Sequence, residues 1–568
     1  MFLLVSAAAL GCLALGYQLS CTALSTGDAS PGLEDSPPQS PTPNPDTGQT
    51  PGSNPGSAPV PGSTPVPNPS TLAGNCPGQP DQPSSGQLGR PVLRTSFGTG
   101  GGWFGSPQAL DVNGDGKPEL IASGDGVTAY TQDGKTLWHA ALSGRCFAGA
   151  VLANLDGKGL PEVVAGDAQG TIRAWKALDG TPLTGWPYTV ANGAGGNEIR
   201  ALAAADLDRD GADEVVAFSQ LTDSGNLPTK YLLEGNGKVM PGWPQYAAKD
   251  PFACTWCGGF NQNIAVADLD SNGVMDVVFN QDVFYQSVFD AKGKPRPVSS
   301  LFTDCGSPLA HWGQVKAYLP QAAEGQRNCG AFEKILEFTF SPPTVADLDH
   351  DGQLEILSVP NSHDPGDLGT TPGSALTVYN PDRTPRAGFA PYKQSDPGRS
   401  LYPGEGGVTE FTPTATAANF TGDSRLEILV TQLDGVARLY DAAGKELWKT
   451  PYSKVQNSVV TEPLVADLDQ DNVPEAILLV TYPDEVKSTL IVLGGKAGDK
   501  RLELDLPFRA VAAPLLADID NDQALELVFS AQGQAPGIYL YDWPGTKANC
   551  LLWPQGRGNP GHTGSYRR

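Results

Sequence analysis

The feature that most constrains this chain is an acidic loop between two apolar runs, which recurs eight times. ALDVNGDGKPELIAS from Ala109 and VADLDHDGQLEILSV from Val345 show the pattern. Successive copies start roughly 40–80 residues apart, a spacing typical of repeat architectures. The first loop residues are Asp111, Asn154, Asp206, Asp268, Asp347, Asn419, Asp467 and Asp518. A unit this small cannot bury its own apolar faces, so we expect the copies to pack against one another.

Each acidic loop is followed by a second hairpin, whose first strand alternates apolar and polar residues. Turns such as Asp133-Gly134 and Asn236-Gly237 reverse the chain there. Four short strands per copy make the blade of a β-propeller. The sequence therefore predicts an all-β propeller of eight four-stranded blades, with seven as the alternative. Residues 91–94 are expected to supply an outer strand beside the last unit, and a Cys76–Cys550 bridge would pin the same seam.

The sequence before the repeats divides into two segments that cannot form a core. Residues 2–16 are apolar and too short to span a bilayer, so residues 1–25 are predicted to be a signal peptide or lipoprotein signal. Cleavage after Ser25 and lipid attachment at Cys12 are the two alternatives. Residues 26–89 consist mainly of Pro, Gly, Ser and Thr, which predicts a disordered linker. Residues 90–568 are expected to form the propeller of an exported protein, either secreted or held at the cell surface or outer membrane as a lipoprotein.

The acidic loops explain the strongly negative balance of the chain. The formal net charge is −25, which argues against nucleic acid as a partner. Counting the first loop residue as position 1, oxygen-bearing side chains fall at positions 1, 3, 5 and 9, and Gly is frequent at position 6. Crowded carboxylates need a cation, and Ca²⁺ fits best because it accepts six to eight oxygens in flexible geometry. We therefore expect about six structural Ca²⁺ ions.

Six of the eight loops carry a full ligand set, and two are degenerate. The predicted metal ligands are Asp111, Asn113, Asp115 and Glu119; Asp206, Asp208, Asp210 and Glu214; Asp268, Asp270, Asn272 and Asp276; Asp347, Asp349, Asp351 and Glu355; Asp467, Asp469, Asp471 and Glu475; and Asp518, Asp520, Asp522 and Glu526. In the loop from Asn154, the ammonium of Lys158 is a candidate substitute for the ion. The loop from Asn419 has Thr421 at position 3 and carries too few charges for strong binding.

These repeats resemble the FG-GAP/VCBS family, whose calcium-loop blades also build the propeller of integrin α-subunits. The resemblance covers roughly residues 100–555. It implies that the loop joins the first two strands of each blade, and that the domain is an extracellular adhesion or binding scaffold. The family also includes modules attached to enzymes, and a fold alone does not give a function.

The irregular insertions are expected on the face opposite the acidic loops. The longest are predicted at about 246–263, 298–341 and 360–412. Long loops on a rigid scaffold commonly carry binding sites. The speculative ligand-binding residues are Trp256, Phe260, Tyr285, His311, Trp312, Tyr318 and Tyr402, unless these aromatics only fill small local cores. Four cysteines in the insertions favour disulfides over a zinc site.

The preferred functional hypothesis is a non-catalytic, calcium-stabilised adhesion or binding protein that recognises a glycan or a protein. The alternative is a propeller-type polysaccharide lyase or hydrolase, for which His311 and His363 are the candidate acid or base. A quinoprotein-like propeller ranks third. Membrane contact is expected only through a lipid anchor, and the oligomeric state is left open.

Overall fold

The structure is a computed structural model. It describes residues 88–98, 105–191, 197–220, 227–246, 258–281, 285–299, 334–363, 373–390, 392–394, 414–423, 425–455, 458–482, 485–532, 536–548 and 550–566, with short strands between 303 and 319. Every regular element in these ranges is a β-strand. A search of the same ranges finds no helix that is long and apolar enough to cross a membrane. The signal region and nearly all of the predicted linker lie outside them, so both remain predictions.

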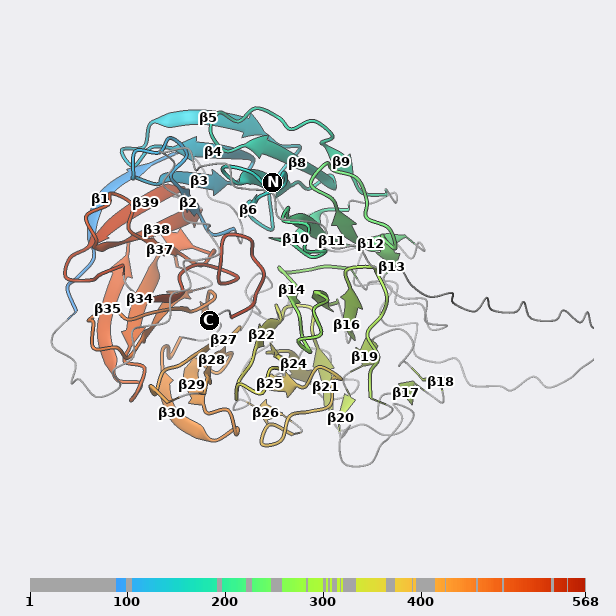
Figure 1. The fold of residues 1–568 in the computed structure, drawn as a ribbon. Coiled ribbons are helices and arrows are strands. Elements are labelled where there is room, and N and C mark those ends of the chain that lie inside the picture. Colours follow the sequence, from blue (N-terminus) through green and yellow to red (C-terminus); the bar gives the residue numbers. More distant parts are fainter. Residues whose placement is uncertain are drawn as a thin grey trace, which may run out of the picture. The chain divides into compact units, whose positions relative to one another are not determined.

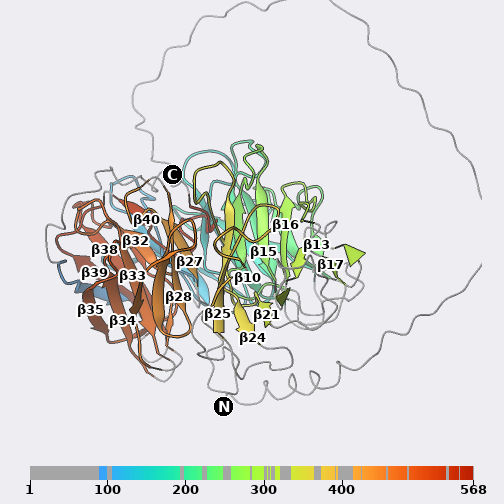
Figure 2. The ribbon, with the colours of Figure 1, turned by 90° about the horizontal axis from the view of Figure 1, so that it is seen from below.

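Eight antiparallel sheets follow one another around a ring, which confirms the eight-bladed propeller (Figure 1). The edge-on view shows the strands running across the thickness of the ring (Figure 2). Blades 1 to 4 comprise β2 (Gln108–Leu110), β3 (Glu119–Ser123), β4 (Gly126–Tyr130) and β5 (Thr136–Ala141); β6 (Val151–Ala153), β7 (Glu162–Gly166), β8 (Thr171–Lys176) and β9 (Tyr188–Thr189); β10 (Ile199–Ala205), β11 (Glu214–Ser219), β12 (Pro228–Leu233) and β13 (Gln245–Tyr246); and β14 (Ile264–Ala267), β15 (Asp276–Asn280), β16 (Tyr285–Asp290) and β19 (Gln314–Lys316).

Blades 5 to 8 keep the same strand order from the centre of the ring outward. They comprise β22 (Thr344–Ala346), β23 (Glu355–Ser358), β25 (Gly373–Tyr379) and β26 (Lys393–Gln394); β27 (Ala415–Ala418), β28 (Glu427–Gln432), β29 (Val436–Tyr440) and β30 (Glu446–Pro451); β32 (Leu464–Ala466), β33 (Glu475–Thr481), β34 (Ser488–Leu493) and β35 (Lys500–Leu506); and β37 (Leu515–Ala517), β38 (Leu525–Gln532), β39 (Gly537–Trp543) and β1 (Val92–Phe97).

Eight further short strands extend or decorate these sheets. They are β17 (Thr303–Asp304), β18 (Ser307–Pro308), β20 (Tyr318–Leu319), β21 (Lys334–Glu337), β24 (Asn361–His363), β31 (Val459–Val460), β36 (Arg509–Ala510) and β40 (Leu551–Trp553).

The ring closes through its N-terminal strand. β1 pairs with β39 over Val92↔Asp542 to Phe97↔Ile538, so the first strand of the described chain is the outer strand of blade 8. In Figure 1 the blue strand lies beside the red ones at this seam. The predicted closing strand is therefore confirmed. Cys76 lies outside the described residues, so its bridge to Cys550 remains a prediction.

The hydrophobic core consists of separate layers between neighbouring blades. One buried cluster fills each of the eight blade-to-blade interfaces that the described residues form. The central strands thus touch a layer on each face, and β7 (EVVAG) and β11 (EVVAFS) are buried along their whole length. Continuous apolar runs are expected of strands covered on both faces, whereas alternation is expected where one face is wet. The outer strand β5 alternates in this way.

Tryptophans near the outer edge join one blade to the next. The indole N–H of Trp138 donates to the carbonyl of Ala177 in blade 2 at 2.8 Å. Trp186, Trp243 and Trp448 make the corresponding bonds to the carbonyls of Gly235, Ala291 and Gly495 at 2.7–3.0 Å. Trp543, on the third strand of blade 8, instead donates at 2.8 Å to the carbonyl of Gly89, just before the outer strand of the same blade. Trp553 precedes a proline, as Trp186 and Trp243 do, but it belongs to β40, whose partner is the innermost strand of blade 7.

The C-terminal segment after β40 lies at the centre of the ring (Figure 1). Its carbonyls accept hydrogen bonds of 2.7–2.9 Å from backbone N–H groups of the innermost strands of five blades. The donors occupy the same repeat position, two residues before position 1 of the acidic loop: Leu516, Leu152, Ala204, Val266 and Val345, paired with Pro554, Pro560, Gly561, Thr563 and Gly564. The segment therefore satisfies edge groups that would otherwise face the central channel.

Two buried side chains anchor this segment. Arg557 is 1% exposed and its guanidinium donates to the carbonyls of Ile264, at 3.0 Å, and Pro343, while Glu462 lies 3.5 Å away. Glu462 also accepts hydrogen bonds from the indole of Trp553 and the backbone N–H of Arg557. Such a buried charge is tolerated because it is both paired and hydrogen-bonded.

Candidate metal centres

The eight acidic loops connect the first and second strands of every blade, as predicted. Neighbouring loops touch: the backbone N–H of Leu354 donates to the carbonyl of Leu269, and Leu426 donates likewise to Leu348. Gly211, Gly273 and Gly352 at position 6 all have positive φ, and Asn472 and Gln523 adopt the same backbone region without glycine. Position 4 is also left-handed, with Arg209 at 66° and Ser271 at 53°. Strained non-glycine residues of this kind commonly mark functional loops.

The acid at position 9 holds its loop closed. In all eight repeats one of its oxygens accepts a hydrogen bond from the backbone N–H of position 2, at 2.7–3.2 Å. The position 1 carboxylate accepts from the N–H groups of positions 5 and 6, as Asp206 does from Asp210 and Gly211, at 3.1 Å each. These bonds leave other carboxylate oxygens free to bind a cation inside the loop.

Five of the six predicted ligand sets come together as groups of three carboxylates. In each group one oxygen per residue lies within 4.8 Å of the others, a separation that one shared ion could bridge. The groups are Asp206, Asp208 and Asp210; Asp268, Asp270 and Asp276; Asp347, Asp349 and Asp351; Asp467, Asp469 and Glu475; and Asp518, Asp520 and Glu526.

The loop of blade 7 supplies the clearest test of whether a metal fits. Asp467 and Glu475 are both fully buried, yet Asp467 Oδ1 and Glu475 Oε1 have no hydrogen-bond partner. Burial raises the pKa of Asp467 to about 6 and that of Glu475 to about 9. A divalent cation would bind both free oxygens and keep the carboxylates ionised. The all-oxygen donor set suits Ca²⁺.

Four arginines form a second layer around the loops that the sequence did not reveal. Arg296, Arg386, Arg501 and Arg94 each pair with the acids at positions 3 and 9 of their own blade. All four occupy equivalent places beside the third strand. Position 10 of the loop pairs with a residue of the third strand, that residue pairs with one on the next segment outward, and the arginine comes directly after it. The separation in sequence differs in each blade, which hides the pattern.

The remaining loops depart from the full set in different ways. Asn113 turns its amide N–H toward Glu119 at 2.8 Å, so loop 1 does not bring three carboxylates together. Lys158 is exposed, and no ion pair joins it to a described carboxylate, so nothing supports its predicted role as an ion substitute. Thr421 donates to Glu427 at 3.0 Å in blade 6, where a hydroxyl replaces the acid of position 3.

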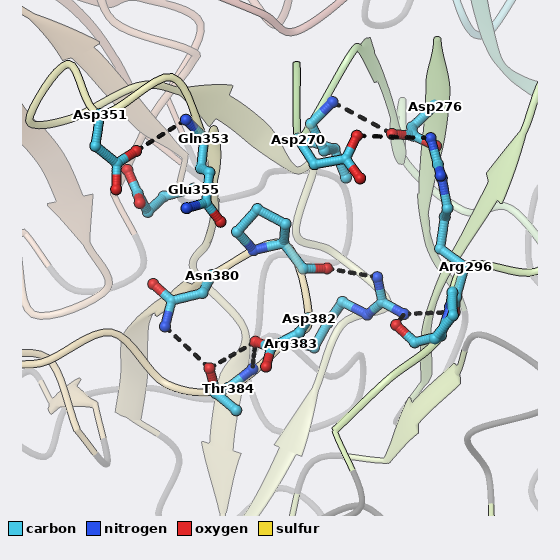
Figure 3. A pocket seen from close by; sticks show the side chains of 13 residues that line it. Asp270, Asp276, Arg296, Asp351, Gln353, Glu355, Asn380, Asp382, Arg383 and Thr384 are labelled. Carbon is cyan, nitrogen blue, oxygen red and sulfur yellow. Dashed lines mark hydrogen bonds and ion pairs between the residues drawn. The ribbon is translucent and has the colours of Figure 1, made fainter. Parts of the chain in front are cut away.

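A cavity of about 560 Å³ lies between the loops of blades 4 and 5. Figure 3 shows Asp270, Asp276 and Arg296 on one side of it and Asp351 and Glu355 on the other. Two neighbouring candidate metal centres therefore contribute to its lining, together with the turn from Asn380 to Thr384.

Most of the speculative ligand-binding residues cannot be placed. Trp256, His311, Trp312 and Tyr402 lie outside the described residues, as do Cys254, Cys257, Cys305 and Cys329. Tyr285 and Tyr318 begin β16 and β20, and only their backbone is described.

Phe260 is the one side chain of this set that the structure describes. It packs against Phe340 with ring centroids 4.8 Å apart, beside a small cluster at the connections between blades, and the guanidinium of Arg200 lies 5.0 Å from its ring. It thus contributes to a local core.

Comparison with known proteins agrees with this architecture. Residues 154–217, from loop 2 to β11, match the family model of the FG-GAP-like repeat. Among curated protein sequences, none matches the chain.

Solved propellers resemble the fold at low sequence identity. BamB from Moraxella catarrhalis is 14% identical with a TM-score of 0.46, over 80% of this chain and 100% of that one. Sqt1 from Saccharomyces cerevisiae is 11% identical with a TM-score of 0.46, over 80% and 99%. The N-terminal BBS1 domain, crystallised in complex with ARL6, is 9% identical with a TM-score of 0.40, over 80% and 97%. The chain is thus an eight-bladed β-propeller that carries an FG-GAP-like repeat across its second and third blades.

Proposed function

We propose that this protein is an exported, non-catalytic binding scaffold whose propeller is stabilised by Ca²⁺ in the acidic loops. The observation that carries the metal assignment is the buried loop of blade 7, where two buried carboxylate oxygens lack a hydrogen-bond partner. The predicted ligands of the six full loops would hold the ions, and the ions would supply charge compensation. The bound ions would then hold the acidic loops in the conformation that their backbone turns already adopt.

Binding is assigned to the face opposite the acidic loops. Acidic loops and third-to-fourth-strand turns share one face, where connections are short. The segments between second and third strands and between blades carry the long insertions, such as 247–257 and 395–413. Because the C-terminal segment fills the centre of the ring, we place the partner, a glycan or a protein, on these insertions and not in the channel. Adhesion at the cell surface is the setting that this assignment favours.

Removal of the metal tests the first half of the proposal. At a free Ca²⁺ concentration ten times the Kd, each site adds ~1.4 kcal/mol to the free energy of unfolding. The six full loops then contribute at most ~8 kcal/mol to the free energy of unfolding, which compares with the ~5–15 kcal/mol of a whole domain. We expect excess chelator to lower the melting temperature markedly and Ca²⁺, more than Mg²⁺, to restore it. An unchanged melting temperature would rule out structural ions.

A paired binding and cleavage assay tests the second half. Glycan arrays and cell-surface protein panels, probed with and without Ca²⁺, should show retention of a ligand. The same ligand, incubated with the protein, should keep its chain length. Shortening of a polysaccharide that is lost in His311→Ala would favour the lyase or hydrolase alternative.

A further inference from the structure

The eight loops share one design but differ in what occupies the second oxygen of the position 9 acid. One oxygen always accepts the backbone N–H of position 2. The other faces an arginine in blades 4, 5, 7 and 8, and the side chain of position 3 in blades 1 and 6. In blade 3, both hydrogen bonds to the Glu214 carboxylate, from the backbone N–H groups of Leu207 and Asp208, go to Oε2, and no described residue bonds to Oε1. Glu162 in blade 2 belongs to a degenerate loop.

Blades 3 and 5 form a natural matched pair. Their loops carry the same ligand types, Asp at positions 1, 3 and 5 and Glu at position 9, with Gly at position 6. The backbone beside the third strand also matches, because the N–H of Met240 donates to the carbonyl of Leu232 at 2.9 Å and that of Arg386 donates to the carbonyl of Val378 at 2.8 Å. The difference is the side chain: Arg386 bridges Asp349 and Glu355, whereas Met240 packs in the apolar layer with Leu207.

From this comparison we infer that the loop between β10 and β11 is the highest-affinity cation site of the ring, and that the four arginines weaken cation binding at the loops they contact. The inference rests on the proposed metal binding and adds a ranking to it. Arg386 already neutralises one charge and occupies oxygens that a metal would use. Among the described residues, the four carboxylates of the loop between β10 and β11 accept hydrogen bonds only from neutral groups, so a cation bound there is attracted by their full negative charge.

The expected difference in affinity is at least about tenfold. A unit positive charge roughly 5 Å from a divalent ion raises its free energy by more than RT ln 10 even at the dielectric constant of water. The arginines are therefore positioning residues, which hold the acids in place without the ion and set its affinity when it binds.

Counting tight ions by competition with a chromophoric chelator tests the ranking. We expect one tight Ca²⁺ in the wild-type protein, none in Glu214→Gln and two in Arg386→Met. Arg386→Lys, which keeps the charge, should return the count to one. Arg425→Met is the matched control: this exposed arginine lines a neighbouring hollow with Arg386 but pairs with Asp423 of the degenerate loop, so the count should stay at one.

Two results would overturn the inference without touching the proposed function: equal affinities at all sites in the wild type, or an unchanged count in Arg386→Met. Absence of any bound Ca²⁺ would overturn both. Since Arg386→Met could fold poorly without metal, its melting temperature is measured in chelator and in Ca²⁺. A deficit in chelator that Ca²⁺ restores supports the role of the arginine, and a deficit that Ca²⁺ leaves unchanged counts against it.

Discussion

The buried anchor of the C-terminal segment offers the sharpest test of how this ring is held together. Substituting Arg557→Met removes the guanidinium from Ile264 and Pro343 and leaves Glu462, whose side chain is 7% exposed, without its cation. Removing one partner of a buried pair costs ~3–5 kcal/mol. Glu462 keeps two neutral donors, the Trp553 indole and a backbone N–H, so we expect a loss near ~3 kcal/mol.

Equilibrium urea unfolding at saturating Ca²⁺ measures this loss. Lys500→Met serves as the control, because Lys500 and Glu503 form an exposed pair 2.7 Å apart and such pairs contribute ~0–1 kcal/mol. Combining Arg557→Met with Glu462→Gln should recover part of the loss, since no uncompensated charge then remains buried. A change below ~1 kcal/mol in the free energy of unfolding for Arg557→Met would refute the reasoning, because the C-terminal segment would then not stabilise the ring through this buried anchor.

Three further predictions concern single side chains. Burial, and after it the nearby charge of Arg557, lowers the pKa of His562 to about 3 in the folded protein. Between the ordinary histidine pKa of 6.5 and this value, only the unfolded chain binds a proton at this residue. The free energy of unfolding should therefore fall by up to ~1.4 kcal/mol per pH unit as the pH drops below 6.5. Urea midpoints at pH 7 and pH 5 should therefore differ less in His562→Asn than in the wild type; equal differences would contradict this assignment. Arg94→Leu should destabilise the ring by roughly 1–3 kcal/mol, because it leaves the side chain of Glu526, which is 1% exposed, without its ion-pair partner. Leu93→Ala on the same strand is the control and should have little effect, because Leu93 is 45% exposed. Urea unfolding together with hydrogen exchange of β1 measures both effects. Burial raises the pKa of Cys146 to about 12, so iodoacetamide at pH 8 should modify the Cys146 peptide only after unfolding, and rapid modification of the native protein would show that the thiol is accessible.

The sequence predicted the parts of this fold that repeat at fixed positions. Apolar runs, glycine turns and loop oxygens recur in each blade, and the closing strand at Val92 followed from the need to complete the last unit. Glycine, which the sequence shows to be frequent at position 6 of the loop, has a positive φ there in several loops, and Asn472 and Gln523 adopt the same backbone at that position. Position 4 was missed, because Arg209 and His350 give no sign of positive φ in their residue type.

What the sequence could not show are contacts between residues whose separation varies. Arg386 lies after its loop with an insertion between them, and Arg94 pairs with Asp520 from the opposite end of the propeller. The C-terminal segment binds mainly through backbone carbonyls, which leave no pattern of side chains. Trp553 precedes a proline, as Trp186 and Trp243 at the outer edge do, but it pairs beside β32.

The central segment has a consequence for how this propeller comes apart. In a linear repeat array each unit touches only its neighbours, and segments can melt independently. Here one stretch of about a dozen residues is bonded to Leu516, Leu152, Ala204, Val266 and Val345 at once. None of these five blades can therefore fray at its inner strand without breaking a bond to a segment that the other four share. The amide hydrogens of these five residues should exchange with a common free energy, equal to that of global unfolding, which would make the ring one cooperative unit despite its modular sequence.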